Sequence, residues 1–232
     1  RGGAILLREP ELLERIVRAV RAAVPAAVPV TAKMRLGYEH TDLALDCARA
    51  LESGGAAQLV VHARTKVQGY QPPAHWEWIA RIREAVAVTV YANGEIWSVA
   101  DWQRCRAVSG AADFMLGRGL VALPDLARQV RAAAAGQTPQ PQSRGERLAL
   151  VERFWQRLLQ QTPPAYAAGR LKQWWVLLMC GDRALAPLWS EIKRERDPQA
   201  IGARLAAARA QALSEEATSS ATRSPDSSAP ST

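Results

Sequence analysis

Cysteine is scarce in this 232-residue chain, and long apolar runs are missing from it. The three cysteines, Cys47, Cys105 and Cys180, are odd in number and have no CxxC spacing. We therefore expect no disulfide framework, and a reducing, cytoplasmic setting fits this usage. No apolar run approaches ~18 residues, so we expect no membrane-spanning helix, and we see no secretory signal peptide.

Motifs that identify common nucleotide and metal sites are also absent. The chain has no Walker A loop and no GxGxxG, HExxH or GxSxG sequence. Its three histidines, His40, His62 and His75, lack a spacing suited to one shared metal ion. We therefore predict neither a nucleotide-binding loop nor a zinc site, and we expect no bound metal.

Acidic residues are outnumbered. The chain carries 30 Lys and Arg against 22 Asp and Glu, a net charge of +8, and its pI is near 10.0. Residues 144–212 hold 12 of the basic residues and 6 of the acidic ones, so the basic excess is densest there. This distribution favours a polyanionic partner.

What the chain does contain is a regular alternation of strand-like and helix-like segments. Apolar runs occupy residues 28–32, 59–61, 86–92 and 112–116. Helical patterns follow or precede them at residues 10–24, 41–51, 76–82 and 98–105, and again from residue 124. His62 follows Lys33 by 29 positions and Asn93 follows His62 by 31, a period typical of right-handed βα units. The sequence therefore predicts four βα units with a parallel sheet, half of an eight-stranded barrel.

Local signals mark where several of these helices begin. Pro10 suits a first helical turn. Thr41 is a candidate N-cap for the second helix. Ser98, with Asp101 three residues later, is typical of a capping arrangement.

The composition changes after residue 135. Residues 136–143 (GQTPQPQS) predict a polar linker, and residues 144–212 show only helical patterns rich in Arg, Trp and Leu. We expect an α/β domain over residues 1–135 and a small all-α bundle over residues 144–212. Ser, Ala, Thr and Pro dominate residues 213–232, which predicts a disordered tail.

Polar groups follow each predicted strand at the same end. Lys33 is a mobile cation able to neutralise a phosphate, and His62 can donate to a carbonyl or a phosphate. Residues 93–94 (Asn-Gly) offer an amide beside closely approachable backbone, and residues 117–119 (GRG) suit a phosphate clamp. Each alone has an ordinary explanation as a solvated strand end or a turn. Four of them on one rim predict a ligand site.

Four motifs, in this order and spacing, carry a resemblance to a known family. They are residues 30–37 (VTAKMRLG), 61–65 (VHART), 93–96 (NGEI) and 115–119 (MLGRG). Together they resemble the bacterial tRNA-dihydrouridine synthases, over residues 1 to about 212. Residues 65–70 (TKVQGY), 95–97 (EIW) and 170–174 (RLKQW) are most similar to the C-type branch, which acts on the uridine at tRNA position 16.

The resemblance implies a fold and an activity. The family fold is a flavin-binding TIM barrel followed by a helical RNA-binding domain, so this chain would be the second half of the barrel plus the helical bundle. The family reduces uridine in the D-loop of tRNA to 5,6-dihydrouridine, using flavin mononucleotide (FMN) that NADPH recharges. The resemblance thus implies FMN and NADPH as cofactors, tRNA as partner, and a monomeric full-length enzyme.

The resemblance also assigns roles to residues. Lys33 would meet the flavin ring, and His62 the flavin or its phosphate. The ribityl-phosphate would be held by Asn93, Gly94, Glu95, Gly117 and Arg118. The residues that match RNA-contacting positions of the C-type branch are Tyr70, Arg170, Lys172 and Lys193.

One family feature is missing. The family places its catalytic cysteine in an Asn-x-Gly-Cys-Pro turn before the segment that matches Gly2 and Gly3, and none of the three cysteines here stands in such a turn. The resemblance therefore implies that the chain is truncated, with the catalytic cysteine upstream of Arg1. We expect the chain alone to be inactive.

Two other interpretations fit the same residues. Another FMN-dependent barrel, acting on a small molecule such as dihydroorotate, would present similar strand-end groups but would not need the basic helical segment. A non-catalytic RNA-binding protein with a degenerate half-barrel would bind tRNA without flavin affinity. The basic segment could also be only a solvated surface, formed by Arg153, Arg157, Arg194 and Arg196.

Overall fold

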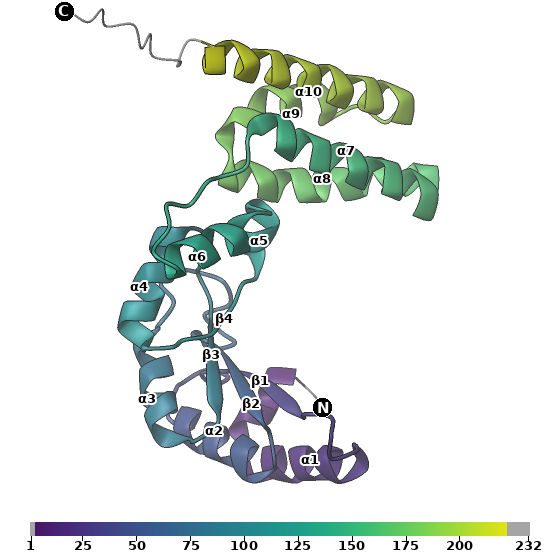
Figure 1. Ribbon diagram of the computed structural model, residues 1–232. Helices are drawn as coiled ribbons and strands as arrows, with labels where there is room; N and C mark the ends of the chain where they lie inside the picture. Colours follow the sequence, from purple (N-terminus) through teal and green to yellow (C-terminus); the bar gives the residue numbers. More distant parts are fainter. Residues whose placement is uncertain (1–2, 222–232) are drawn as a thin grey trace, which may run out of the picture. The chain divides into compact units, whose positions relative to one another are not determined.

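The chain folds into two compact units, Arg1–Leu120 and Val121–Thr232. The computed structural model describes residues 3–221. Strands alternate with helices in the first unit, whereas every regular element in the described part of the second unit is a helix (Figure 1). Within residues 3–221, no helix is long and apolar enough to cross a lipid bilayer.

Four βα units make up most of the first unit. Its elements are η1 (Gly3–Arg8), α1 (Pro10–Ala23), β1 (Thr31–Arg35), α2 (Ala44–Ser53), β2 (Gln58–His62), α3 (Glu77–Ala85), β3 (Thr89–Asn93), α4 (Val99–Ser109), β4 (Phe114–Met115) and α5 (Arg118–Ala122), the last of which runs into the second unit. The strands form one parallel sheet in the order β1-β2-β3-β4. The predicted parallel sheet of four βα units is thus confirmed.

The carboxyl ends of the four strands are in register. Arg35 pairs with His62, His62 with Asn93, and Asn93 with Met115. Because paired residues of neighbouring strands point to the same face of a sheet, these four side chains form one row across its end. That row is the foundation of the site described below.

The two faces of the sheet differ in burial. One face carries Leu59, Val61 and Ala92, which are fully buried, and helices α2, α3 and α4 run along it (Figure 1). The alternate residues point the other way; among them Lys33 is exposed and Tyr91 is half-buried. The unit therefore has one apolar face packed under helices and one more polar, open face.

The first strand lies further along the chain than the sequence predicts. The apolar run at residues 28–32 predicts a strand there, but β1 covers Thr31–Arg35 and Val28 is exposed. Pro29 has no N–H to donate to a neighbouring strand, which explains why pairing begins after it. As a result Lys33 and Arg35 lie within the strand and not in the loop beyond it.

The second unit is a set of packed helices. They are α6 (Leu126–Ala134), α7 (Arg144–Gln161), α8 (Pro164–Gly181), the short η2 (Arg183–Leu185), α9 (Ala186–Ile192) and α10 (Pro198–Ala221). Buried side chains from α7, α8, α9 and α10 form one core, with Trp155 and Trp175 as its largest members. A capping box begins α7, since Ser143 Oγ accepts from the Glu146 amide and the Glu146 side chain accepts from the Ser143 amide.

Helix α10 continues past the predicted start of the tail. It runs to Ala221, so the prediction of disorder from residue 213 is wrong for residues 213–221, and residues 222–232 lie outside the described range. The reason is tertiary. Leu213 fills the space beside Gly145, lying 2.7 Å from where a Cβ would be, and Glu216 accepts from the Gly145 amide at 2.8 Å. Composition alone does not reveal these contacts with the start of α7.

Candidate functional site

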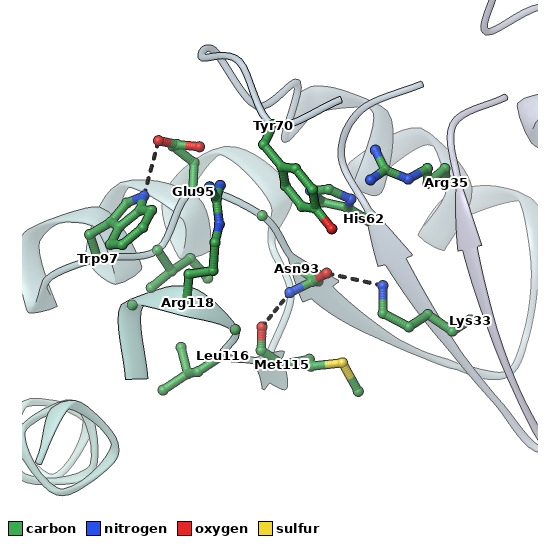
Figure 2. Close-up of a pocket in the computed structure, with 14 residues that line it drawn as sticks. Lys33, Arg35, His62, Tyr70, Asn93, Glu95, Trp97, Met115, Leu116 and Arg118 are labelled. Atoms are coloured by element: carbon green, nitrogen blue, oxygen red, sulfur yellow. Dashed lines mark hydrogen bonds between the residues drawn. The ribbon is translucent and has the colours of Figure 1, made fainter. Parts of the chain in front are cut away.

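A pocket of about 370 Å³ opens at the carboxyl ends of the strands (Figure 2). It stands on the end row of the sheet and is bordered by the segments that follow β2, β3 and β4. All seven residues that the resemblance assigns to cofactor binding lie in it: Lys33, His62, Asn93, Gly94, Glu95, Gly117 and Arg118. Tyr70, assigned to RNA, lines the same pocket.

Hydrogen bonds fix the amide at the end of β3. Lys33 Nζ donates to Asn93 Oδ1 at 3.3 Å, and Asn93 Nδ2 donates to the Met115 carbonyl oxygen at 2.7 Å (Figure 2). Lys33 has three N–H donors, and within the described residues this is the one hydrogen bond its side chain makes. The ammonium therefore keeps donors available for a ligand.

The loop after β3 has a backbone that ordinary residues rarely adopt. Gly94 has φ of 118°, and a Cβ built there would lie 2.9 Å from the His62 ring, so only glycine fits. Glu95 follows with φ of 56°, an uncommon conformation for a residue with a side chain. Trp76 Nε1 donates to the Gly94 carbonyl at 2.9 Å and holds the turn from outside. Such strain is typical of functional loops held by their surroundings.

The Glu95 carboxylate is anchored from two sides. Trp97 Nε1 donates to Glu95 Oε1 at 3.0 Å, and the guanidinium of Arg64 forms an ion pair with Glu95 Oε2. Arg64 is fully buried, and its Nε also donates to the Pro73 carbonyl oxygen at 3.1 Å. One buried cation thus joins the segment after β2 to the loop after β3.

The Arg118 guanidinium lies between two aromatic rings. Its Cζ is 4.4 Å from the ring centroid of Tyr70 and 5.0 Å from that of Trp97, as Figure 2 shows. Arg35 approaches Tyr70 from another direction, with its Cζ 5.3 Å from the ring centroid. Arg35 also donates to the carbonyl oxygens of Thr65 and Gly69, which positions the loop that carries Tyr70. Cation–π contacts therefore order this wall of the pocket.

Two glycines, one before α5 and one in its first turn, shape the chain after β4. A Cβ at Gly117 would meet nothing within 4 Å, so its backbone is open to an approaching ligand. A Cβ at Gly119 would lie 2.0 Å from the Ile96 carbonyl oxygen, so only glycine lets α5 pack this closely on the loop after β3. The predicted Gly-Arg-Gly segment thus has one glycine open to the pocket and one required for packing.

Positive charge dominates the electrostatics of the pocket. Burial lowers the pKa of His62 to about 4, helped by the charges of Arg35, Lys33, Arg64 and Arg118. The imidazole is therefore neutral at pH 7. Partial desolvation of its ammonium, with a smaller effect of Arg35, also lowers the pKa of Lys33. A cluster of cations around a neutral histidine favours an anionic ligand, because a bound anion relieves their mutual repulsion.

None of the three cysteines lines this pocket. Cys47 lies in α2 and Cys105 in α4, and both are buried on helices beside the sheet. Burial raises the pKa of Cys47 to about 11 and that of Cys105 to about 12. Cys180 is exposed in α8, in the second unit. No group of three or more His, Cys, Asp and Glu in the described part of the chain could hold a metal ion.

The other residues assigned to RNA contact belong to the second unit. Arg170 is exposed in α8, and Lys193 is exposed at the end of α9. Lys172 is half-buried, and its ammonium donates to the Glu195 carbonyl oxygen at 2.5 Å. Lys172 therefore ties α8 to the connection between α9 and α10 in addition to any role at the surface.

Sequence reasoning left several pocket residues without a role. Arg35 and Trp97 line the pocket, and the buried Arg64 supports it from behind. A signal existed for Arg35, because it lies two positions after Lys33 and the period of a strand places both on one face. Trp97 and Arg64 act through contacts with Glu95 and Arg118, which no local spacing indicates.

Comparison with known proteins identifies relatives of this chain. The family model described as dihydrouridine synthase (Dus) matches residues 1–211. The chain is 57% identical to the tRNA-dihydrouridine(16) synthase of Aquipseudomonas alcaligenes over 206 residues, which cover 89% of this chain and 65% of that protein. It is 61% identical to the protein of the same name from Pseudomonas syringae pv. tomato over 197 residues, covering 85% of this chain and 62% of the relative.

A third relative gives the same result. The tRNA-dihydrouridine(16) synthase of Pseudomonas putida is 56% identical over 213 residues, which cover 92% of this chain and 66% of the relative. The chain thus spans slightly less than two thirds of the length of each of these proteins.

Proposed function

This chain belongs to the dihydrouridine synthase family, and from that premise we propose that it supplies the flavin- and tRNA-binding part of an enzyme that reduces uridine in tRNA to 5,6-dihydrouridine. The names of its relatives support position 16 as the target. The observation that carries the proposal is the pocket, where Lys33, Arg35 and Arg118 surround neutral His62 at one end of the sheet.

The proposed architecture is the second half of a TIM barrel followed by a helical RNA-binding domain. Four parallel strands with helices along one face support the half-barrel, since the inner face of a barrel carries no helices. The packed helices α7 to α10 support the second part, which would follow a linker at 136–143 and extend beyond the predicted range of residues 144–212 to the end of α10.

The pocket has groups that suit FMN. We propose that Lys33 and His62 face the flavin ring, and that Arg118 and the open backbone at Gly117 hold the phosphate. Asn93, Gly94 and Glu95 would line the ribityl chain. When bound, a flavin recharged by NADPH would supply the hydride that uracil reduction needs. Lys33 would stabilise negative charge on the reduced ring.

Reduction of uracil also requires a proton donor at the second carbon of the double bond. Cys47 and Cys105 are buried on helices outside the pocket, and Cys180 lies in the other unit. We therefore propose that the acid is a cysteine in the part of the relatives that this chain does not match. The 232 residues alone would then form no dihydrouridine.

Binding of tRNA is assigned to Tyr70 and to the second unit. Tyr70 is exposed at the pocket and offers a ring against which a base can stack. Arg170, Lys172 and Lys193 would contact the tRNA backbone. We further propose that the complete enzyme is monomeric and acts in the cytoplasm, in keeping with the cysteine usage.

Flavin binding tests the proposal directly. The test uses a polypeptide that joins this chain to the unmatched part of the Pseudomonas syringae relative, called the joined polypeptide below. Arg118→Met should weaken FMN binding by at least tenfold, because it removes a charge-assisted contact worth about 1.5–3 kcal/mol. Arg131→Met, which removes an exposed arginine from α6, is the matched control and should leave the affinity unchanged. Equal FMN affinity in the two variants would contradict the assignment.

A further inference from the structure

We propose that a groove between α7 and α10 binds RNA backbone phosphates, a second RNA site that rests on the proposed tRNA binding but uses none of the residues assigned to it above. The groove has a volume of about 680 Å³. One side of it is formed by α7 and the other by α10. The proposal depends on what each side presents.

The two sides differ in length and polarity. On α7 the exposed lining side chains are long and polar, and they include Arg153, Arg157 and Gln160. On α10 the lining residues are Gly202, Ala206 and the buried Leu205. Gly202 and Ala206 are four positions apart and therefore lie on the same side of the helix. The groove is open because short side chains face long ones.

The charge of the groove is positive and uncompensated. Its one carboxylate, on Glu152, is neutralised by Arg209 at 3.0 Å. Elsewhere in the unit Arg144, Arg147 and Arg204 are also paired with acidic side chains. In the described part of the chain, by contrast, neither Arg153 nor Arg157 lies within 4.0 Å of a carboxylate.

A neighbouring side chain contacts Arg157. Its Nε donates to Gln161 Oε1 at 3.3 Å, which directs the guanidinium along α7, and within residues 3–221 this is the one hydrogen bond its side chain makes. Guanidinium groups present N–H donors only, and the amides of Gln156 and Gln160 can add more. A site dominated by donors and positive charge suits an oxyanion, and RNA offers such anions at regular spacing.

The residue at the bottom of the groove indicates whether the groove suits phosphates or nucleobases. Trp155 lines it but is only 1% exposed, so its ring offers no face on which a base could stack. Its indole nitrogen is buried as well and has no partner in the described structure, so Trp155 offers neither a ring face nor a donor to a ligand in the groove. Contacts here should therefore be to phosphate and independent of base sequence.

The experiment measures tRNA affinity of this chain by fluorescence anisotropy between 50 and 200 mM salt. The groove variant is Arg153→Gln with Arg157→Gln. The control variant is Arg131→Gln with Arg183→Gln, which removes the same charge from exposed positions of the same unit outside the groove. Because all four residues are exposed, both variants should keep the wild-type fold, which circular dichroism checks.

Loss of two phosphate contacts should flatten the slope of log affinity against log salt by about 1.4–1.8. The factor by which the groove variant binds tRNA more weakly than the wild type should accordingly be about tenfold larger at 50 mM than at 200 mM salt. It should be the same for an unrelated RNA duplex, because phosphates carry no sequence information. The control variant should change the slope much less.

Charge placed inside the groove gives a second test. Ala206 is exposed on the α10 side, and Ala206→Glu should weaken tRNA binding whereas Ala206→Lys should strengthen it. Equal slopes for the groove and control variants, or equal affinities for the two Ala206 variants, would overturn the groove site. If Arg170→Ala with Lys172→Ala then still weakened binding, the proposed function would stand without the groove. Complete absence of tRNA binding by the wild-type chain would overturn both.

Discussion

The buried guanidinium of Arg64 connects the segment that follows β2 with the loop that follows β3. It pairs with the Glu95 carboxylate and donates to the Pro73 carbonyl oxygen, although it does not line the pocket itself. Glu95 in turn accepts from Trp97, whose ring contacts Arg118. Arg64 therefore links two segments that border the pocket, although its own side chain lies outside the pocket.

Replacing Arg64 should loosen the pocket. In the joined polypeptide, Arg64→Met should lower the free energy of unfolding by roughly 1–3 kcal/mol, since it removes the hydrogen bond to Pro73 and leaves the half-buried Glu95 carboxylate without its ion-pair partner. Urea unfolding measures this effect. Arg64→Met combined with Glu95→Gln should cost clearly less than the sum of the single changes, because the two residues interact. Strict additivity would show that the ion pair contributes nothing.

His62 should make stability depend on pH. Its pKa is about 4 in the folded chain against an ordinary value of 6.5, so the unfolded chain binds a proton in a range where the folded chain does not. The free energy of unfolding therefore keeps its full value above pH 6.5. It falls by up to roughly 3 kcal/mol as pH drops from 6.5 to 4.

Urea unfolding of the joined polypeptide at several pH values measures this loss. His62→Gln cannot take up the proton, so the difference between wild type and variant isolates it from the titration of carboxylates. As pH falls from 6.5 to 4, we expect wild type to lose up to roughly 3 kcal/mol of stability relative to His62→Gln. Parallel curves across this range would contradict the assignment of a depressed pKa to His62.

For single residues, the sequence predicts correctly those roles that depend only on residues nearby in the chain. Ser98 is an N-cap as expected, with its Oγ accepting from the Asp101 amide. Thr41 is not, since α2 begins at Ala44 and no side chain caps it. The convergence of Lys33, His62 and Asn93 follows from the βα period. The roles of Arg64 and Trp97 depend on tertiary contacts that no spacing reveals.

The exposed parts of the sheet determine whether the chain associates with other copies of itself. In the described structure β1 pairs only with β2 and β4 only with β3, so both edges are open, and one face of the sheet lacks a cover of helices. Open edges and exposed sheet faces favour pairing between chains. We predict that the 232-residue chain self-associates at micromolar concentration, as sedimentation velocity would show.

A charge on the edge strand should reduce this association. Thr31 is exposed in β1 and does not line the pocket, so Thr31→Lys adds a repulsive charge without touching the site. A chain that sediments as a monomer and unfolds in one sharp transition would show that the sheet needs no further partner.

Element order was predictable, whereas element limits were not. The alternation of apolar runs and helical patterns gives the order of β1 to β4 correctly. Pro29 and the exposed Val28 place the start of β1 later than the apolar run suggests. The length of α10 depends on Leu213 and Glu216 meeting Gly145, residues about 70 positions away in the chain. Such long-range contacts lie beyond local composition.

Across the whole molecule, two kinds of positive charge serve different proposed purposes. In the first unit cations gather around one pocket, where desolvation, partial for Lys33, depresses the pKa values of Lys33 and His62. In the second unit the basic excess lies largely on exposed side chains, including Arg153, Arg157 and Arg170. The first arrangement suits a small anionic cofactor and the second a long polyanion.

The most direct test is to measure dihydrouridine by mass spectrometry in tRNA that lacks the modification, after incubation with FMN and NADPH. The joined polypeptide should form dihydrouridine at position 16, and the same polypeptide with Arg118→Met should form much less. The 232-residue chain alone should form none, because none of its cysteines lies at the pocket. Dihydrouridine made by this chain alone, or none made by a folded joined polypeptide with flavin bound, would contradict the account.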